Sequence, residues 1–236
     1  MRYTGNKNRI AKEILPIILK DRRVNQWYIE PFVGGANVID KVEGFRLGSD
    51  YNIHLIRFLK AIQDGWLPPE RISREDYKYI KNNQDEDSRL TFWAGVCCSY
   101  GGKWFGGMLC DYQESRRNKN GVLPNHQDEA RRGLIKQIPN LTGIHFEHCN
   151  YFELEIPSES IIYCDPPYKD TLKYRDNIDH THFYHWCRKM HFEGHKVFIS
   201  EYKMPNDFTC VWSKEVSNTL STVSYTHLTL PTKRIV

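Results

Sequence analysis

The tetrapeptide Asp165-Pro166-Pro167-Tyr168 combines residue types that could act on a planar amine. Proline lacks a backbone N–H and fixes φ, so the two prolines hold the backbone and leave the Pro166 carbonyl ready as an acceptor. The Asp165 carboxylate is a second acceptor, and the Tyr168 ring offers a face for stacking. Two acceptors beside a ring suit a flat aromatic amine, whose N–H bonds they would hold while raising the electron density on its nitrogen.

The residues before this tetrapeptide predict a strand that delivers it. Residues 161–164 (IIYC) are apolar or aromatic, and the run stops at Asp165. Prolines cannot sit inside a central strand, because the ladder needs their missing N–H. A buried strand is therefore predicted to end at about Cys164, with the tetrapeptide as a stiff loop at its carboxyl end.

A glycine pair marks a second loop. In the stretch YIEPFVGGANV, residues 28–38, a predicted strand runs into Gly34 and Gly35, and we expect a helix to follow. Such a turn lets the backbone approach a nucleotide-like ligand. Glu30, before the proline, could meet a positive ligand group. The pattern is not G-x-G-x-x-G, so an ordinary tight turn is the alternative.

Asp50 ends the second predicted strand (GFRLGSD), fifteen residues beyond Gly35. An acid at this place could accept hydrogen bonds from the two hydroxyls of a ribose. The alternative is a helix N-cap, because SDYN is a good capping sequence. Together with the glycine turn, the ribose interpretation is favoured and indicates an adenosine-containing cofactor.

These loops need a scaffold, and the chain alternates strands with helices around them. A helix is predicted from about Asn52, where apolar residues repeat at helical spacing, and another over residues 182–192 before a strand at 196–200. This alternation predicts an α/β fold, with a parallel sheet covered by helices on both faces. In such sheets ligands bind beyond the carboxyl ends of the strands.

Residues 66–143 lack this alternation and are predicted to form an inserted subdomain. They contain SYGGKWFGGM, with four glycines among three aromatics, and two cation-rich stretches at 115–121 and 129–136. A solvated basic face is the plain interpretation of those cations, and contact with a polyanion is the other. The threonine-rich tail at 223–236 has no clear periodicity, and we expect it to be atypical, either disordered or foreign to the domain.

The composition sets outer limits. The 236 residues are 40% hydrophobic and 13% aromatic, the net charge is +4, and the seven cysteines make no C-x-x-C pair. A globular protein with reduced thiols, without a disulfide scaffold or zinc ribbon, is expected. No run reaches the roughly 18 apolar residues of a membrane span, and the first residues lack a secretory signal, so a cytoplasmic protein is expected.

His182, His185 and His191 could suggest a metal site. A catalytic metal would also need a carboxylate or a third ligand aimed at the same point. Surface histidines on an amphipathic helix are the expectation, and no metal is predicted.

Taken together, the motifs resemble those of the Dam-type (alpha-class) DNA adenine-N6 methyltransferases, particularly their phage-encoded relatives. The resemblance rests on RYTGNKNRI, EPFVGGANV, GSDYN, DPPY and GHKVFISEY, in this order and over about residues 1–220. It implies a Rossmann-like catalytic domain (1–65 and 144–222) that uses S-adenosylmethionine, and a mostly helical target-recognition insert (66–143). The partner it implies is double-stranded DNA, in a bacterial or phage-infected cell.

The resemblance also implies roles for single residues. Asp165, Pro166, Pro167 and Tyr168 would bind and stack the flipped adenine, whose amine attacks the sulfonium methyl in line and loses its proton afterwards. The implied cofactor contacts are Tyr3, Lys7, Glu30, Phe32, Gly34, Gly35, Asp50, Asn150 and Asp165. The candidate DNA contacts are Lys103, Trp104, Arg116, Arg117, Asn118 and Lys119.

Two positions depart from the family pattern. Asn150 stands where many relatives carry an acid, although its amide could still bond the cofactor's adenine, and Asn6 stands where a glycine is common. The terminal sequence is also unlike the family's usual ending.

Other substrates stay open. Cytosine N4, an RNA adenine or a glutamine amide are alternative planar amines, and a silent DNA-binding relative is an alternative without turnover. The acid at Asp165 favours adenine, since the cytosine enzymes usually show serine there and the glutamine enzymes asparagine. A monomer or weak dimer is expected, with a cognate restriction endonuclease as a further candidate partner.

Overall fold

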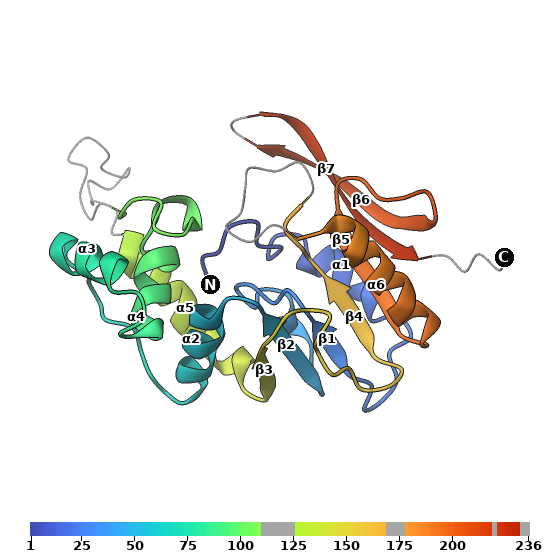
Figure 1. The fold of residues 1–236 in the computed structure, drawn as a ribbon, viewed down its shortest axis with the longest axis horizontal. Helices are drawn as coiled ribbons and strands as arrows, with labels where there is room; N and C mark the ends of the chain where they lie inside the picture. Colours follow the sequence, from blue (N-terminus) through green and yellow to red (C-terminus); the bar gives the residue numbers. More distant parts are fainter. Residues whose placement is uncertain (110–125, 169–177, 219–220, 232–236) are drawn as a thin grey trace.

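The computed structural model describes residues 1–109, 126–168, 178–218 and 221–231. In this part of the chain a seven-stranded sheet has the order β3-β2-β1-β4-β5-β7-β6 (Figure 1). The strands are β1 (Tyr28–Glu30), β2 (Arg46–Asp50), β3 (Ile144–His148), β4 (Ile161–Cys164), β5 (Lys196–Glu201), β6 (Phe208–Asn218) and β7 (Ser221–Pro231).

The first five strands pair in parallel, and β7 joins β5 and β6 in antiparallel pairs. From β1 the chain moves outward through β2 to β3, and it then returns to place β4 on the other side of β1. The order therefore reverses between β1 and β4, where open α/β sheets bind ligands. The predicted strand at 161–164 coincides with β4, and the α/β fold with a parallel sheet is confirmed.

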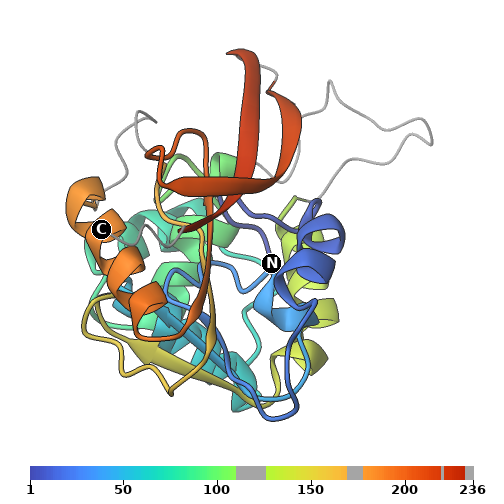
Figure 2. The same ribbon diagram turned by 90° about the vertical axis from the view of Figure 1, so that its right-hand side faces the viewer.

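Helices cover both faces of the sheet, as predicted. Alternate residues of β4 enter different apolar clusters, Ile161 one and Ile162 the other. The first cluster includes residues of α1 (Ala11–Ile18), α2 (Ile53–Gln63) and α5 (His126–Leu141). The second includes Phe183 and Cys187 of α6 (His180–Phe192). Figure 2 shows α1 and α6 on opposite sides of the strands.

The helix expected after the glycine pair is a single 3₁₀ turn, η1 (Ile39–Lys41). Only residues 31–45 connect β1 to β2, and Gly44, with φ +75°, reverses the chain into β2. Of the ten residues between Gly35 and β2, only the three of η1 form a helical turn. The strand β3 is absent from the sequence-based prediction, although its buried Ile144 and Phe146 alternate with exposed residues.

The predicted insert contributes to the same core as the sheet. It contains α3 (Arg74–Asn82), α4 (Ser88–Phe92), a π-helical turn (Trp93–Cys97), a 3₁₀ turn (Tyr100–Gly102) and α5. The rings of Phe92 and Trp93 lie 4.9 and 6.5 Å from that of Phe58 in α2. Gln137 of α5 donates hydrogen bonds to the carbonyls of Gly35 and Ala36. The division at residues 66 and 143 therefore stays a prediction.

The tail at 223–236, expected to be disordered or foreign to the domain, contains most of one strand. Residues 221–231 form β7, which lies between β5 and β6. Threonine, valine and tyrosine have high β propensity, and this composition suits a strand without the alternation of a half-buried one. Residues 232–236 lie outside the described part.

Candidate active site

Residues from three distant parts of the chain meet at the reversal of the strand order. Asp165 follows β4, Glu30 ends β1, and Lys7 comes from the N-terminal segment. The Lys7 Nζ donates a hydrogen bond to Asp165 Oδ2 at 2.9 Å, lies 2.8 Å from the other carboxylate oxygen, and donates a second hydrogen bond to the Gly5 carbonyl at 3.0 Å. The Lys7 side chain is 11% exposed and that of Asp165 is 21% exposed. The ion pair is thus largely shielded from water.

The Tyr168 ring is held from the β5 side. Its hydroxyl shares a 2.8 Å hydrogen bond with Ser200 Oγ, and its ring makes an edge contact with Tyr202 at 4.4 Å between centroids. The Lys7 Nζ lies 4.6 Å from the ring centroid, within cation–π range. The ring is therefore held beside the Asp165 carboxylate.

Burial dominates the electrostatics of both acids. It raises the pKa of Asp165, and the Lys7 ammonium opposes this rise by favouring the charged form. Glu30 is 3% exposed, and burial raises the pKa of its carboxyl well above the usual range, although a 2.8 Å hydrogen bond from the Tyr28 hydroxyl opposes the effect. The site thus holds one acid with a cation at hand and a second that favours its neutral form.

The glycine turn lies under Tyr3. Gly34 has a φ of +46°, and its N–H donates to Asp50 Oδ2 at 3.1 Å. A Cβ at Gly34 would come within 2.9 Å of the Tyr3 ring, and one at Gly35 would lie 2.9 Å from Tyr3 Cβ. Both positions therefore require glycine, because the N-terminal segment packs directly on the turn.

Asp50 is not the cap of α2. Asn52 is the N-cap, and its side chain accepts from the N–H groups of His54 and Leu55. Asp50 instead accepts from Asn52 N–H and from the glycine turn. Its carboxylate joins the loop after β1 to the end of β2, facing the same sheet edge as Asp165.

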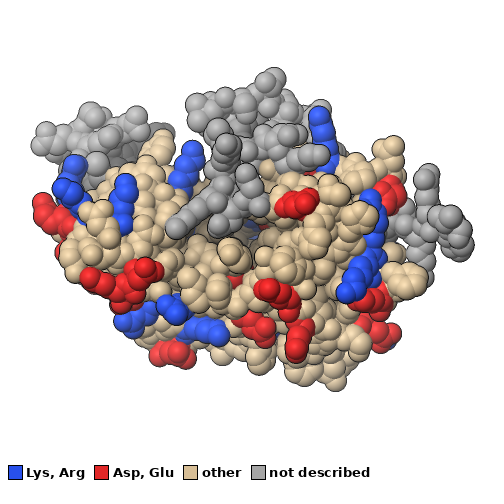
Figure 3. All heavy atoms as spheres, in the orientation of Figure 1, with Lys and Arg blue, Asp and Glu red and all other residues tan. Residues whose placement is uncertain are grey.

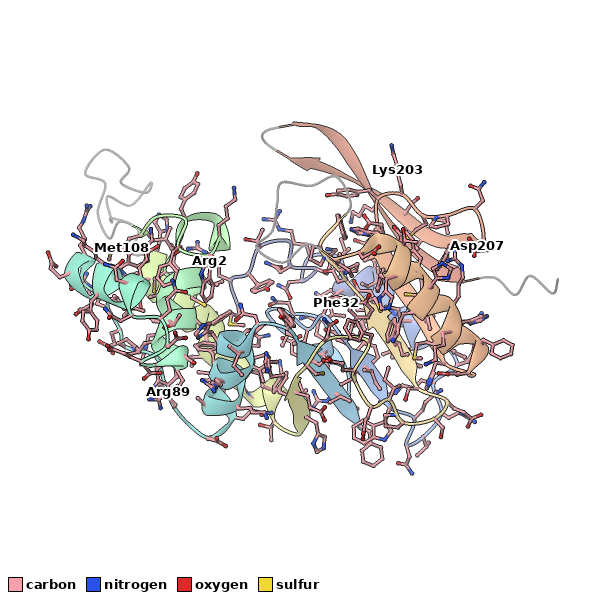
Figure 4. The ribbon with its side chains drawn as sticks, viewed as in Figure 1. Arg2, Phe32, Arg89, Met108, Lys203 and Asp207 are labelled. Atoms are coloured by element: carbon pink, nitrogen blue, oxygen red, sulfur yellow. The ribbon has the colours of Figure 1, made fainter. Side chains whose placement is uncertain are left out.

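Phe32 and Asn150 are placed less directly. Phe32 is half-buried, and its ring lies 5.3 Å from Tyr151 and 5.6 Å from Phe183 of α6; Figure 4 shows it near the middle of the molecule. Asn150 follows β3, whose last residue His148 pairs in register with Asp50. Asn150 is half-buried, and its N–H donates to Glu153. Asn150 therefore lies at the same carboxyl end of the sheet as Asp50.

Three contacts lie outside the sequence-based site. Ser200 orients Tyr168, Thr4 Oγ1 donates to the Gly101 carbonyl at 3.0 Å, and the space beside Gly102 is filled by the backbone of Thr4 and Tyr3. The contacts of Thr4 and Tyr3 with Gly101 and Gly102 join the N-terminal segment to the insert over nearly a hundred residues of sequence. No local pattern signals such pairs. Nothing in the sequence FISEY predicts that Ser200 bonds to Tyr168.

Of the candidate DNA contacts, Lys103 is exposed, whereas Trp104 packs on the protein. The Trp104 ring lies 5.6 Å from His54 and 5.3 Å from Phe105, and it is partly buried against the first cluster. Basic and acidic side chains are interspersed on the face in Figure 3. The other candidates, Arg116, Arg117, Asn118 and Lys119, lie outside the described residues.

The histidines of α6 make local contacts. His182 Nδ1 shares a 2.7 Å hydrogen bond with the Tyr151 hydroxyl, and His180 lies 3.8 Å from Glu201. Over the described ranges, no three His, Cys, Asp or Glu side chains gather as a metal site. In the same ranges, none of the helices has the length and apolar character needed to cross a bilayer.

Residues 3–94 match the family model of the D12 class N6 adenine-specific DNA methyltransferases. The match spans less than half of the chain and includes Lys7, the glycine turn and Asp50. Asp165 lies beyond it. No curated protein matches the chain.

Solved structures give distant likenesses, each at 10% identity. TrmN from Thermus thermophilus has a TM-score of 0.39, with 95% of this chain and 48% of that chain covered. The yhhF protein from Escherichia coli also scores 0.39, with 99% and 90% covered. SMU.472, complexed with SAH, scores 0.36, with 98% and 55% covered. The chain thus spans about half the length of the first and third.

Proposed function

We propose that the chain is a DNA adenine-N6 methyltransferase that uses S-adenosylmethionine. The observation that carries the proposal is the placement of Asp165 and the fixed Tyr168 ring at the reversal of the strand order, beside the glycine turn and Asp50. The family match over residues 3–94 supports the same class independently, because it does not include Asp165.

The residues present fit the cofactor. Asp50 and the N–H groups of the glycine turn would hold its ribose and methionine ends. The Asp50 oxygens accept backbone N–H groups of Gly34 and Asn52, and a ribose hydroxyl would donate to the same carboxylate. Asn150, at the same edge, would hold the adenine. When bound, the cofactor supplies an electrophilic methyl on a positively charged sulfur.

Asp165 and the Pro166 carbonyl would orient the target amine. Each accepts one of its two N–H bonds, and the Tyr168 ring stacks on the base. As the amine nitrogen gains its fourth bond it becomes positive, and the Asp165 carboxylate stabilises that charge. The amine proton leaves afterwards, so these residues act by position and charge. Ionised Asp165 is the active form.

The proposed substrate is double-stranded DNA, approached by the insert. Lys103, exposed beside the 3₁₀ turn that holds Thr4, would contact phosphate. The DNA contact of Trp104 stays a prediction. A cognate restriction endonuclease is a further proposed partner.

The experiment is methyl transfer from radiolabelled S-adenosylmethionine to unmethylated genomic DNA, followed by digestion to nucleosides and mass spectrometry. N6-methyladenine is expected. Detection of N4-methylcytosine instead would identify cytosine, and not adenine, as the substrate. Parallel reactions contain total RNA and a pool of unmodified proteins. Label only in RNA or protein would overturn the DNA assignment, and absence of label in all of them, despite binding of S-adenosylhomocysteine, would point to a silent relative.

A further inference from the structure

The Lys7 ammonium lies between the two groups that would receive the target amine. It is 2.8 and 2.9 Å from the Asp165 carboxylate oxygens and 4.6 Å from the centre of the Tyr168 ring. An ammonium group donates hydrogen bonds to a carboxylate and interacts with a π face. It therefore contacts two of the groups that an aromatic amine would use, the Asp165 carboxylate and the Tyr168 ring.

The segment that carries Lys7 is fixed at both sides of the site. Tyr3 packs on the glycine turn, and Thr4 bonds to Gly101 of the insert. Asn6 Nδ2 donates to the Tyr3 carbonyl and Lys7 Nζ to the Gly5 carbonyl, so residues 3–7 form a closed turn. The anchored backbone sets where the lysine side chain starts, and its four-carbon stem still allows its tip to move.

We propose that Lys7 is a placeholder: its ammonium occupies the amine position in the free protein, and the entering base displaces it. The inference rests on the proposed function. An amine entering this space would compete with Lys7 for Asp165 Oδ2, and the Lys7 Nζ also lies 2.8 Å from Oδ1. The role of Lys7 thus differs from the cofactor contact that the family resemblance implies. Lys7 is a positioning residue that acts while the amine site is empty.

The Lys7 ammonium stabilises the charged form of Asp165 in the free protein. Asp165 is largely shielded. Among the described residues, the charged or titratable groups that face it are Lys7 from the N-terminal segment, Glu30 at the end of β1, Tyr163 in β4 and Tyr168 in its own loop. Of these, Lys7 supplies the cation. Without it, burial would favour the protonated acid, which could accept less well from an amine.

Two substitutions separate the roles. Lys7→Met keeps the length without the charge, and Lys7→Arg keeps the charge in a planar fork that grips a carboxylate more firmly. At pH 8, we expect the KM for unmethylated genomic DNA to fall several-fold in Lys7→Met and to rise several-fold in Lys7→Arg. The Kd of S-adenosylhomocysteine, from calorimetry, should stay within about twofold. A tenfold weaker Kd with an unchanged KM would overturn the placeholder.

The pH profile gives a sharper division, because kcat/KM reports the free enzyme and kcat the bound complex. In Lys7→Met the acid limb of kcat/KM should move to higher pH, since free Asp165 has lost its cation. The acid limb of kcat should not move, since Lys7 has already left in the wild-type complex. Movement of both limbs, or of neither, would contradict displacement.

One readout needs no activity and so separates this inference from the proposed function. The Asp165 carboxyl is titrated by carbon NMR in the free wild type and in Lys7→Met, with thermal unfolding to verify that both are folded. A higher Asp165 pKa in the variant is expected, and equal values would overturn the pairing. A wild type that shows the pairing but transfers no methyl group would instead overturn the proposed function.

Discussion

The backbone N–H of Gly34 donates a hydrogen bond to the carboxylate of Asp50 over 3.1 Å. This bond joins the loop after β1 to the end of β2, and it requires Gly34 to keep a φ of +46° with Tyr3 packed on it. The turn, the acid and the N-terminal segment therefore form one unit. Changes in any of them should alter the proposed cofactor site before they alter the rest of the fold.

Gly34→Ala should weaken S-adenosylhomocysteine binding at least tenfold and destabilise the protein by about 1–2 kcal/mol, because the left-handed conformation and the Tyr3 ring both oppose a Cβ. Gly133→Ala in α5 is the matched control, since its Cβ would meet open space. That change should stabilise the helix by about 0.5–1 kcal/mol and leave binding unchanged. Calorimetry and urea unfolding measure both, and equal effects would contradict the account of the turn.

Asp165→Asn should lower the methylation rate by about 10²–10⁴-fold, the range expected for a lost electrostatic contact to the reacting group. The amide keeps the shape of the side chain but turns N–H donors toward Lys7 and the substrate amine. Binding of S-adenosylhomocysteine should change only a few-fold. A variant that retained wild-type turnover would exclude Asp165 from the reaction.

Ser200→Ala should reduce kcat by about tenfold, because Tyr168 loses the hydrogen bond that orients its ring. Tyr168→Phe removes the other partner of the same bond while keeping the ring. The double variant should therefore be no slower than the slower single variant. Additive losses in the cycle would show that the two hydroxyls act separately.

Glu30→Gln should change the pH dependence of stability. The folded pKa of Glu30 is raised above its ordinary 4.5, so the unfolded chain ionises first as the pH rises. The stabilisation from neutral Glu30 is complete below pH 4.5 and is lost as the pH rises toward the folded pKa, at about 1.4 kcal/mol per pH unit. The wild type should lose stability relative to Glu30→Gln over this window. If urea unfolding gave the two proteins parallel curves of unfolding free energy against pH, the raised pKa of Glu30 would be contradicted.

Lys103→Gln should weaken DNA binding and lower the slope of log affinity against log salt by about 0.9, the effect of one lost phosphate contact. The control is Lys60→Gln, an exposed lysine in the last turn of α2, at the end away from Asp50. Binding titrations at several salt concentrations measure the slopes. Equal slopes in both variants would remove Lys103 from the interface.

The local parts of the fold followed from the sequence. The strand ending at Cys164 was predictable because prolines stop a ladder, and α2 was predictable from its apolar spacing. The strand β7 was not, because its threonine-rich sequence lacks alternation and pairs only through tertiary contacts. The 3₁₀ turn that stands in place of the helix expected after Gly35 was not predictable either.

The site was predictable in its residue types but not in its contacts. Lys7 and Asp165 lie 158 positions apart, and nothing in either motif predicts their ion pair. Trp104 is a second example: the sequence does not show that its ring lies beside those of His54 and Phe105, and its DNA contact stays a prediction. Local patterns specify strand ends and turns, whereas partners across the fold depend on the packing of whole elements.

The most direct test of the central claim is single-molecule sequencing of unmethylated genomic DNA after incubation with S-adenosylmethionine and either the wild type or Asp165→Asn. The account predicts N6-methyladenine within one short recurring motif for the wild type and almost none for the variant. Unmodified adenine in the wild-type reaction, with S-adenosylhomocysteine bound and the protein folded, would contradict it.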